Sequence, residues 1–249
     1  MPPPSPFFIV IIGAAAGLFY YAAFYYFRRK RLIENTPTSK VRSLAMGLVE
    51  VFGKAQMFKK LKKSPISKKD CVYYTLEVQE YVKSGKQGHW KTIKFETSNN
   101  DFYVQDETGK VLVNPKEVML EIKPSYQNQK GFVIKQSKEA LAYLENAKLF
   151  KKNSFGLMPQ LKIIEKAILK NQELYVIGRA EKNPYPNKEI TNESNLMIKM
   201  GNENVFIISD KKENDIVKGY LKRLIGFLIA AIICSTIAFI ILIKIIKAW

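Results

Sequence analysis

The sequence predicts an α+β fold in which a strand-rich soluble domain lies between two transmembrane helices. Two uncharged apolar stretches, one near each end of the chain, predict the helices. Between them, short runs alternate apolar with polar side chains and are rich in β-branched and aromatic residues, a pattern typical of strands. All 22 acidic residues also lie in this middle region, which favours a domain exposed to water.

The first apolar stretch covers residues 7–27 and follows a short N-terminal tail, residues 1–6. As an α-helix it would reach roughly 31 Å, enough to cross a bilayer. A cleaved signal peptide is the alternative interpretation. The positive charges follow this apolar run instead of preceding it, and the run is too long for the apolar region of a signal peptide, so we predict a transmembrane helix.

The second apolar stretch covers residues 224–243 and is followed by a short tail, residues 244–249. Ser235 and Thr236 interrupt it, but their hydroxyls can bond to backbone carbonyls within a helix. We predict a second transmembrane helix here, which makes the chain an integral membrane protein with two spans.

Basic residues cluster on the inner side of both stretches. Residues 28–31 are all basic and follow the first stretch, and three basic residues within 218–223 precede the second, against two within 244–249. Basic residues near the ends of a span favour the cytoplasmic side. Both stretches therefore predict a cytoplasmic middle domain with both termini outside.

The region between the stretches is strongly basic. It holds 38 of the 40 Lys and Arg and all 22 acids, a net charge of +16. Such a field suits anionic lipid, an acidic membrane protein partner or nucleic acid. We predict a membrane-facing loop at one local cluster, with a solvated surface loop as the alternative. The cluster consists of Lys54, Lys59, Lys60, Lys62, Lys63, Lys68 and Lys69.

The folded domain is predicted over residues 47–210, after a basic juxtamembrane linker with a short helical stretch at 28–46. The clearest hairpin covers residues 102–115, where Gly109 supplies the positive φ that a turn at 106–109 needs. The remaining elements are strands at 47–55, 71–82, 89–97 and 118–124, helices at 137–148 and 160–170, and a juxtamembrane helix at 211–223.

A short motif occurs twice. VEVFGKA at residues 49–55 returns as LYVIGRA at residues 174–180. We therefore predict two similar, OB-like β-units, at 47–135 and 171–210, joined by a helical connection at 136–170. In the second unit a hairpin over 196–210 would turn at 201–204. Chance similarity of two short strands is the alternative.

The chain offers little for catalysis or metal binding. A zinc site needs about four Cys, His or carboxylate ligands, and the sequence has only Cys71, Cys234 and His89. Cys71 with His89 as base, or Ser64 with a lysine, are the available nucleophile pairs, and neither has a supporting signature. We predict no catalytic residue, no metal and no cofactor.

Nucleic-acid binding is a hypothesis from another class. Tyr73, Tyr74, Trp90 and Phe102 could stack on bases, as aromatic residues of OB-like folds do. Aromatic residues at alternating strand positions more often belong to the core. Nucleic acid is therefore the less favoured partner.

The first apolar stretch also contains two glycines four residues apart. Gly13 and Gly17 occur in GAAAG, a spacing that lets helix backbones approach closely. The motif predicts pairing of the two spans or of two copies as a homo-oligomer. Simple filling of the helix by small residues is the alternative.

Several passages resemble one known family. They are TPTSKVRSLAMGLVEVFGKA at 36–55, SPISKKDCVYYTLEVQEY at 64–81, FYVQDETGKVLVNP at 102–115, ELYVIGRA at 173–180 and FIISDKKE at 206–213. In order and spacing they resemble the GIDE or beside-a-membrane (BAM) domain of MULAN-type mitochondrial E3 ubiquitin ligases and their prokaryotic relatives. The resemblance implies a membrane-associated regulatory or scaffolding module, which a cytosolic RING finger follows in the organelle proteins.

The sequence departs from the organelle proteins in two respects. It ends six residues after the second stretch and lacks the cysteines and histidines of a RING, so we expect a prokaryotic, non-enzymatic form without ligase activity. A ubiquitin-ligase-related role by family resemblance alone remains the alternative. The organelle proteins also look to have this domain outside the cytosol, whereas the flanking charges here predict the cytoplasmic side.

Overall fold

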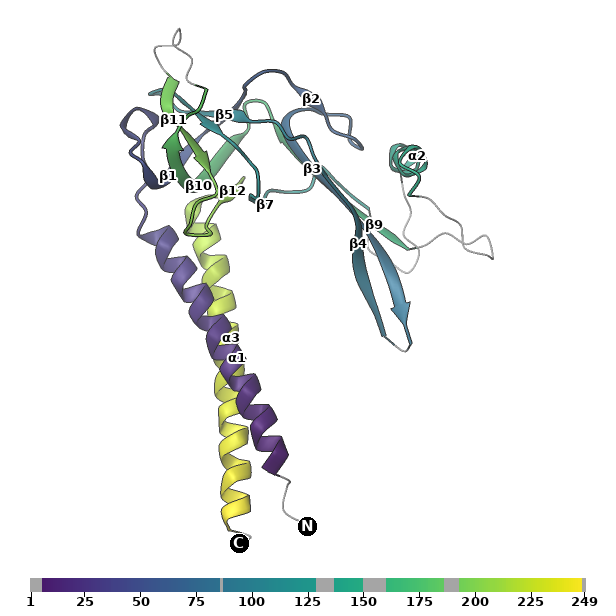
Figure 1. The fold of residues 1–249 in the computed structure, drawn as a ribbon, viewed down its shortest axis with the longest axis vertical. Helices are drawn as coiled ribbons and strands as arrows, with labels where there is room; N and C mark the ends of the chain where they lie inside the picture. The colour runs from purple at the N-terminus through teal and green to yellow at the C-terminus, as the bar shows by residue number, and fades with distance from the viewer. Residues whose placement is uncertain (1–5, 86, 129–136, 150–159, 186–192, 248–249) are drawn as a thin grey trace. The chain divides into compact units, whose positions relative to one another are not determined.

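The fold is described from a computed structural model, which covers residues 6–85, 87–128, 137–149, 160–185 and 193–247 (Figure 1). The chain divides into two compact units. One comprises Met1–Pro37 and Lys212–Trp249, and the other Thr38–Lys211. The prediction of an α+β domain flanked by two apolar helices is confirmed.

The helical unit consists of α1, Pro6–Glu34, and α3, Glu213–Ile246, which run antiparallel side by side (Figure 1). Both are long and apolar enough to cross a membrane. Ala16 and Ala23 are buried seven residues apart on α1, the spacing of helices that pack along a seam. The rings of Tyr26 and Phe227 stack across this seam, 5.4 Å apart.

Five strands of the other unit close into a barrel. They are β1 (Gly47–Met57), β5 (Phe102–Gln105), β6 (Lys110–Val113), β10 (Glu173–Lys182) and β11 (Glu193–Lys199). The order is β1-β5-β6-β11-β10, and β10 pairs again with β1. Only the β6–β11 pairing is parallel among these five strands. This closed, five-stranded arrangement is that of the OB fold.

The repeated motif forms two strands of the same barrel. β1 and β10 pair so that Gly53 faces Leu174 and Val49 faces Gly178. A Cβ on Gly53 would lie 2.5 Å from the Gln105 carbonyl oxygen, and one on Gly178 would lie 2.7 Å from the Phe206 ring. Both glycines are needed for close approach, and the two predicted β-units are one barrel, because the repeats supply each other's hydrogen-bond partners.

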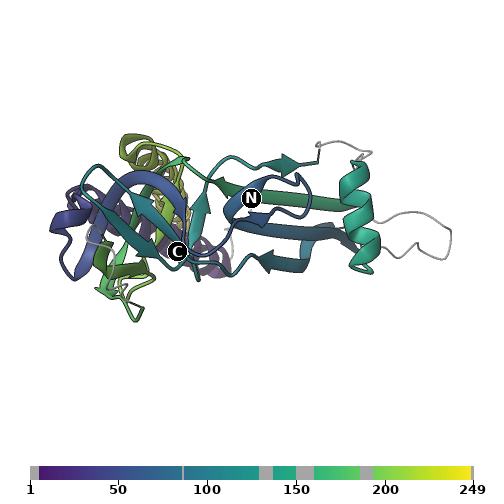
Figure 2. The ribbon, with the colours of Figure 1, turned by 90° about the horizontal axis from the view of Figure 1, so that it is seen from above.

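A second sheet is formed by segments that lie between the barrel strands in the sequence. Its strands are β2 (Lys62–Lys63), β3 (Asp70–Ser84), β4 (Gln87–Thr97), β8 (Tyr126–Gln127) and β9 (Leu161–Leu169). The central strand is β3, which pairs with β2, β4 and β9, and β8 pairs with β9. Helix α2, Lys138–Asn146, crosses these strands (Figure 2). Leu144 of α2 packs with Leu76, Val78 and Ile163 on one face of the sheet.

Short elements complete the domain. A 3₁₀ turn, η1, covers Val41–Ser43, where the sequence predicts a short helical stretch. Strands β7 (Met119–Glu121) and β12 (Ile207–Ser209) extend the barrel sheet next to β10. The predicted hairpin over 196–210 does not form, because β11 and β12 both pair with β10 and not with each other.

The prediction of a helix over 160–170 is wrong, because this segment is β9. Side chains of β9 alternate between buried and half-buried, with Ile163 and Glu165 on the covered face. Its lysines, glutamate and alanine favour helices locally, but pairing with β3 decides the outcome. The helix predicted at 137–148 is confirmed as α2, whose N-cap Ser137 accepts a hydrogen bond from the Ala140 N–H.

Candidate functional site

Six of the seven predicted lysines lie on one segment, residues 58–69, which we call the lysine loop. Within it, Lys62 pairs with Cys71 and Lys63 with Asp70, which places β2 at the edge of β3. Lys62 is half-buried, and the other five lysines of the loop are exposed. The fold therefore presents a compact basic surface at this edge of the sheet.

A buried carboxylate holds the lysine loop in place. Glu165 on β9 is fully buried, and it accepts hydrogen bonds from the backbone N–H groups of Ile66, at 2.6 Å, and Ser67, at 3.2 Å. The hydroxyls of Ser67 and Ser125 also donate to it. Ile66 is buried in the core beneath. The backbone of the loop is thus fixed, while its lysines point outward.

The lysines of the loop are available to an anion. Within the described part of the chain, none of the six lies within ion-pair distance of a carboxylate. The Lys59 ammonium lies 5.5 Å from the centre of the Phe58 ring, and Phe58 packs edge-on against Tyr103 of the barrel. Apolar packing therefore orders the start of the loop, and the Lys59 charge also acts on the Asp101 carboxyl, whose pKa burial raises and Lys59 lowers.

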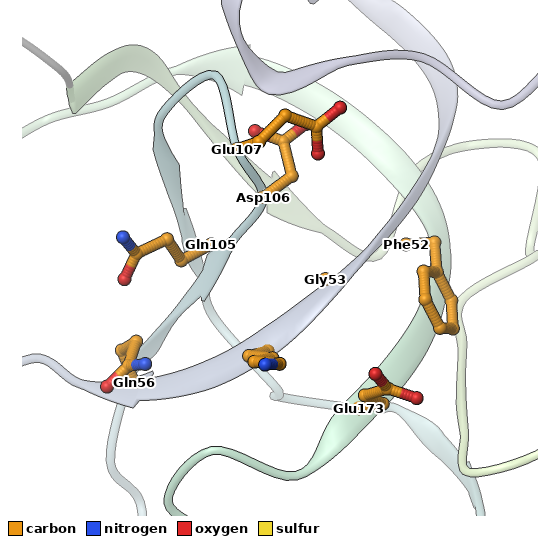
Figure 3. Close-up of a pocket in the computed structure, with 8 residues that line it drawn as sticks. Phe52, Gly53, Gln56, Gln105, Asp106, Glu107 and Glu173 are labelled. Carbon is orange, nitrogen blue, oxygen red and sulfur yellow. The ribbon is translucent and has the colours of Figure 1, made fainter.

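The seventh lysine, Lys54, lies in a different environment. It is on β1 opposite Glu173 and lines a pocket of about 410 Å³ together with Asp106 and Glu107 (Figure 3). Three carboxylates surround this pocket. The structure therefore separates Lys54 from the lysine loop and gives it acidic neighbours.

Asp106 fixes the turn that borders this pocket. Its carboxylate accepts hydrogen bonds from the Thr108 hydroxyl and from the N–H groups of Val41, Thr108 and Gly109. Partial burial acts to raise the pKa of Asp106, but these hydrogen bonds outweigh it and hold the pKa below its usual range. The carboxylate thereby ties η1 to the β5–β6 turn.

The nucleophile pairing of Cys71 with His89 does not form. Cys71 begins β3, whereas His89 pairs with Val82, eleven residues further along the same strand. At about 3.3 Å per residue the two side chains are roughly 36 Å apart. Burial raises the pKa of the Cys71 thiol to about 12, so it is protonated at neutral pH.

The positions of the cysteines and the histidine also decide whether they could bind zinc together, as the ligands of a RING finger do. Cys71 and His89 are too far apart to share a metal ion, and Cys234 lies within α3. Among the described residues, no three His, Cys, Asp or Glu side chains come together in a group that could hold a metal. These residues therefore do not fit a zinc site of the kind that the RING finger of the organelle proteins contains.

The four aromatic residues considered for base stacking lie in different environments. Tyr73 and Phe102 are buried in the core with their rings 6.4 Å apart. The Tyr74 hydroxyl donates to Glu96 at 2.9 Å. Only Trp90 of the four is substantially exposed, at 39%. They do not form a shared stacking platform.

Gly13 and Gly17 lie on an open side of α1. A Cβ on either would meet no atom within 4 Å, whereas Ala16 and Ala23 are buried. The close packing of α1 therefore uses the alanines, and the glycine pair remains a predicted site for association with a further helix.

Sequence patterns missed two carboxylates that organise this region. Glu165 lies in a segment with helical propensity, so no local pattern marks it as buried. Asp106 occupies the first position of a predicted turn, where Asp commonly bonds to the backbone, and this signal could have identified it.

Comparison with known proteins gives one match. No curated protein and no solved structure matches the chain. A family model described as GIDE, E3 Ubiquitin ligase, matches residues 73–243, which is more than half of the chain. The chain belongs to the GIDE family.

Proposed function

We propose that this chain is a membrane-anchored regulatory or scaffolding module, without catalytic activity of its own, whose β-rich domain binds anionic lipid at the cytoplasmic surface. The observation that carries the proposal is the lysine loop, a fixed backbone that presents five exposed lysines without ion pairs among the described residues. Each Lys near an anionic membrane contributes about 1 kcal/mol to binding.

The two apolar helices support this proposal, since they would keep a bilayer within reach of the domain. The flanking basic residues support the cytoplasmic side. The family description supports a second candidate, a ubiquitin-ligase-related role. A partner that supplies the zinc-binding surface would then be required, because the residues described above do not provide one.

Lipid binding is tested with the full chain in nanodiscs. A chain with Cys71→Ala, Cys234→Ala and Lys60→Cys carries an environment-sensitive fluorophore on the loop, and a nitroxide-labelled lipid serves as quencher. We expect strong quenching in anionic nanodiscs that falls as salt is raised. Equal quenching in zwitterionic nanodiscs would contradict the proposal. A label at Lys182→Cys, an exposed position on β10 of the barrel, is the matched control.

Orientation is tested in intact cells. A cysteine at Lys116 in the same Cys-free background is treated with a membrane-impermeant maleimide before and after lysis. Labelling only after lysis supports a cytoplasmic domain. Labelling in intact cells would place the domain on the other side and would remove the cytoplasmic lipids as partners.

A further inference from the structure

A second hairpin of the same sheet extends beyond its neighbours. β9 pairs with β3 only as far as Glu80, whereas β3 and β4 pair with each other up to Ser84 and Gln87 (Figure 1). Gly85 lies in the connecting turn with φ of +62°, a conformation that suits a tight hairpin. We call residues 80–95 the aromatic hairpin, because beyond Tyr81, whose N–H donates to the Gln160 carbonyl, its strands pair only with each other among the described residues.

Three aromatic side chains lie on one face of this hairpin. Trp90 faces Tyr81 across the strands, and their rings are 5.3 Å apart. A Cβ on Gly88 would lie 2.3 Å from the Tyr81 hydroxyl, so Gly88 leaves room for the ring to fold over the strand. Phe95, opposite Glu77, is on the same face and is 63% exposed.

This face is opposite to the one that α2 covers. Leu76 and Val78 of β3 pack under α2, whereas Glu77 and Tyr81 alternate with them and point the other way. The Glu77 carboxylate is occupied by hydrogen bonds from Gln79 and Thr92. Exposed Trp90 with half-buried Tyr81, and exposed Phe95, therefore lie on a face that no described helix covers, with polar Gln79 and Thr92 between them.

One lysine borders the aromatic side chains. Lys83 lies two residues from Tyr81 on the same face, is exposed and forms no ion pair with a described residue. Lys91, opposite Glu80, and His89, opposite Val82, are exposed on the other face of the hairpin. Trp and Tyr side chains, which have an apolar ring and a polar group that stays in water, are common at the boundary between water and lipid, as are lysines beside them.

The edge of the hairpin disfavours the addition of a protein strand. β4 carries a bulge at Ile93, between the pairs Val78–Lys94 and Gln79–Thr92. Lysines occur on both sides of this bulge. Bulges and lysines are the devices that protect edge strands from further pairing. We therefore expect this hairpin to contact a lipid bilayer and not to pair with a β-strand from a second copy.

We propose that the aromatic hairpin inserts Trp90 and the neighbouring Tyr81 ring into the headgroup layer of an anionic bilayer, with Lys83 on the lipid phosphates. The proposal rests on the proposed function in taking the bilayer as the partner. It uses residues other than the lysine loop, so either surface can fail independently of the other.

The test follows the fluorescence of Trp90 in the full chain, with Trp249→Phe so that Trp90 is the one remaining tryptophan. The protein is placed in nanodiscs of anionic or zwitterionic lipid, with or without brominated acyl chains as quencher. We expect quenching in anionic nanodiscs, and a weakening of docking by about fivefold in Lys83→Gln, since a lysine near the surface contributes about 1 kcal/mol. Lys182→Gln, at an exposed position on β10 of the barrel, is the matched control and should leave the quenching unchanged.

Three outcomes would overturn the proposal. The first is no quenching of Trp90 in either lipid, and the second is equal quenching in both, which would remove the role of the net negative charge of the bilayer. A blue shift that depends on protein concentration and not on bromine would indicate a second copy. Quenching at Trp90 with none at the labelled lysine loop would support the hairpin and contradict the loop.

Discussion

The lysine loop and the aromatic hairpin lie at opposite ends of strand β3 and differ in what holds them to the core. The loop lies at the start of β3, where Glu165 and Ile66 fix its backbone to the core. The hairpin lies at the other end, where beyond Tyr81 its two strands pair with each other alone among the described residues. One surface carries lysines on an anchored backbone, and the other carries aromatic rings on a hairpin that extends beyond its neighbours. The difference teaches that a single strand can have an anchored basic segment at one end and an extended aromatic hairpin at the other.

The comparison also predicts different responses to solution conditions. A fixed set of lysines acts through charge, which salt screens with a Debye length of about 8 Å at physiological ionic strength. Rings that leave water act through apolar burial, which salt does not screen. The two surfaces can therefore be separated by perturbing one cause at a time.

Removal of the Glu165 carboxylate should have the largest effect. Glu165→Ala leaves the buried N–H groups of Ile66 and Ser67 without an acceptor, at a cost of about 1–3 kcal/mol each. We expect lower stability in urea denaturation and rapid tryptic cleavage after Lys68. Glu173→Ala, at an exposed position, is the control. If cleavage at the loop were unchanged, the carboxylate would not be what fixes it.

Neutralising the loop should have the next largest effect, on membrane docking and not on stability. Lys59→Gln/Lys60→Gln/Lys63→Gln should weaken docking by about 1 kcal/mol per lysine and flatten its salt dependence. Fluorophore quenching at several salt concentrations measures this. Lys54→Gln should have little effect, because Lys54 lies among carboxylates. A loss as large as that of the triple variant would show that Lys54 belongs to the same surface.

The turn that Asp106 fixes should respond to acid. Because hydrogen bonds lower the pKa of Asp106 in the folded state, its contribution to stability is full above the unfolded pKa of about 3.9 and is lost as the pH falls through the folded pKa. Asp106→Asn should be less stable at pH 7 by about 1 kcal/mol and should lose less on acidification. Urea denaturation between pH 7 and pH 2 tests this. Parallel stability curves for the two proteins would refute it.

A methyl group at Gly88 should have the smallest effect on stability. Gly88→Ala displaces the end of the Tyr81 side chain, which is flexible, so we expect a change within about 0.5 kcal/mol. Quenching of Trp90 should nevertheless change, because its partner ring moves. Gly178→Ala is the contrast, since its Cβ would meet packed side chains of the barrel and cost about 1–3 kcal/mol. Equal effects of the two would mean that the hairpin is as rigid as the barrel.

Local chemistry made parts of the fold predictable. The hairpin at 102–115 is predicted from Asp106 and Gly109, and the Asp106 N–H does donate to the Gly109 carbonyl. The positive φ expected at Gly109 is wrong, because the described glycines with positive φ are Gly47 and Gly85. Helix α2 was predicted from its cap, Ser137. The lysine cluster can be read directly from the sequence, because its members are close together along the chain. In each case the decisive partners are a few residues apart.

Distant partners made the rest unpredictable. The identity of β9 depends on β3, some 90 residues earlier, and its own composition favours a helix. The burial of Glu165 depends on loop N–H groups that no local pattern locates. Aromatic residues at strand positions were expected in the core, which holds for Phe102 but not for Trp90, because β4 is an edge strand whose end has one partner.

Closure of the barrel has a consequence for how the chain folds during synthesis. β1 is completed by β10, and paired residues such as Lys54 and Glu173 are about 120 positions apart. At about 5–20 residues per second, a ribosome needs roughly 6–24 s to make that interval. The β5–β6 hairpin can form meanwhile, but the long edge of β1 stays open until β10 emerges. Pairing over such sequence separations is intrinsically slow. Nascent chains of this protein should therefore need protection from aggregation during that interval.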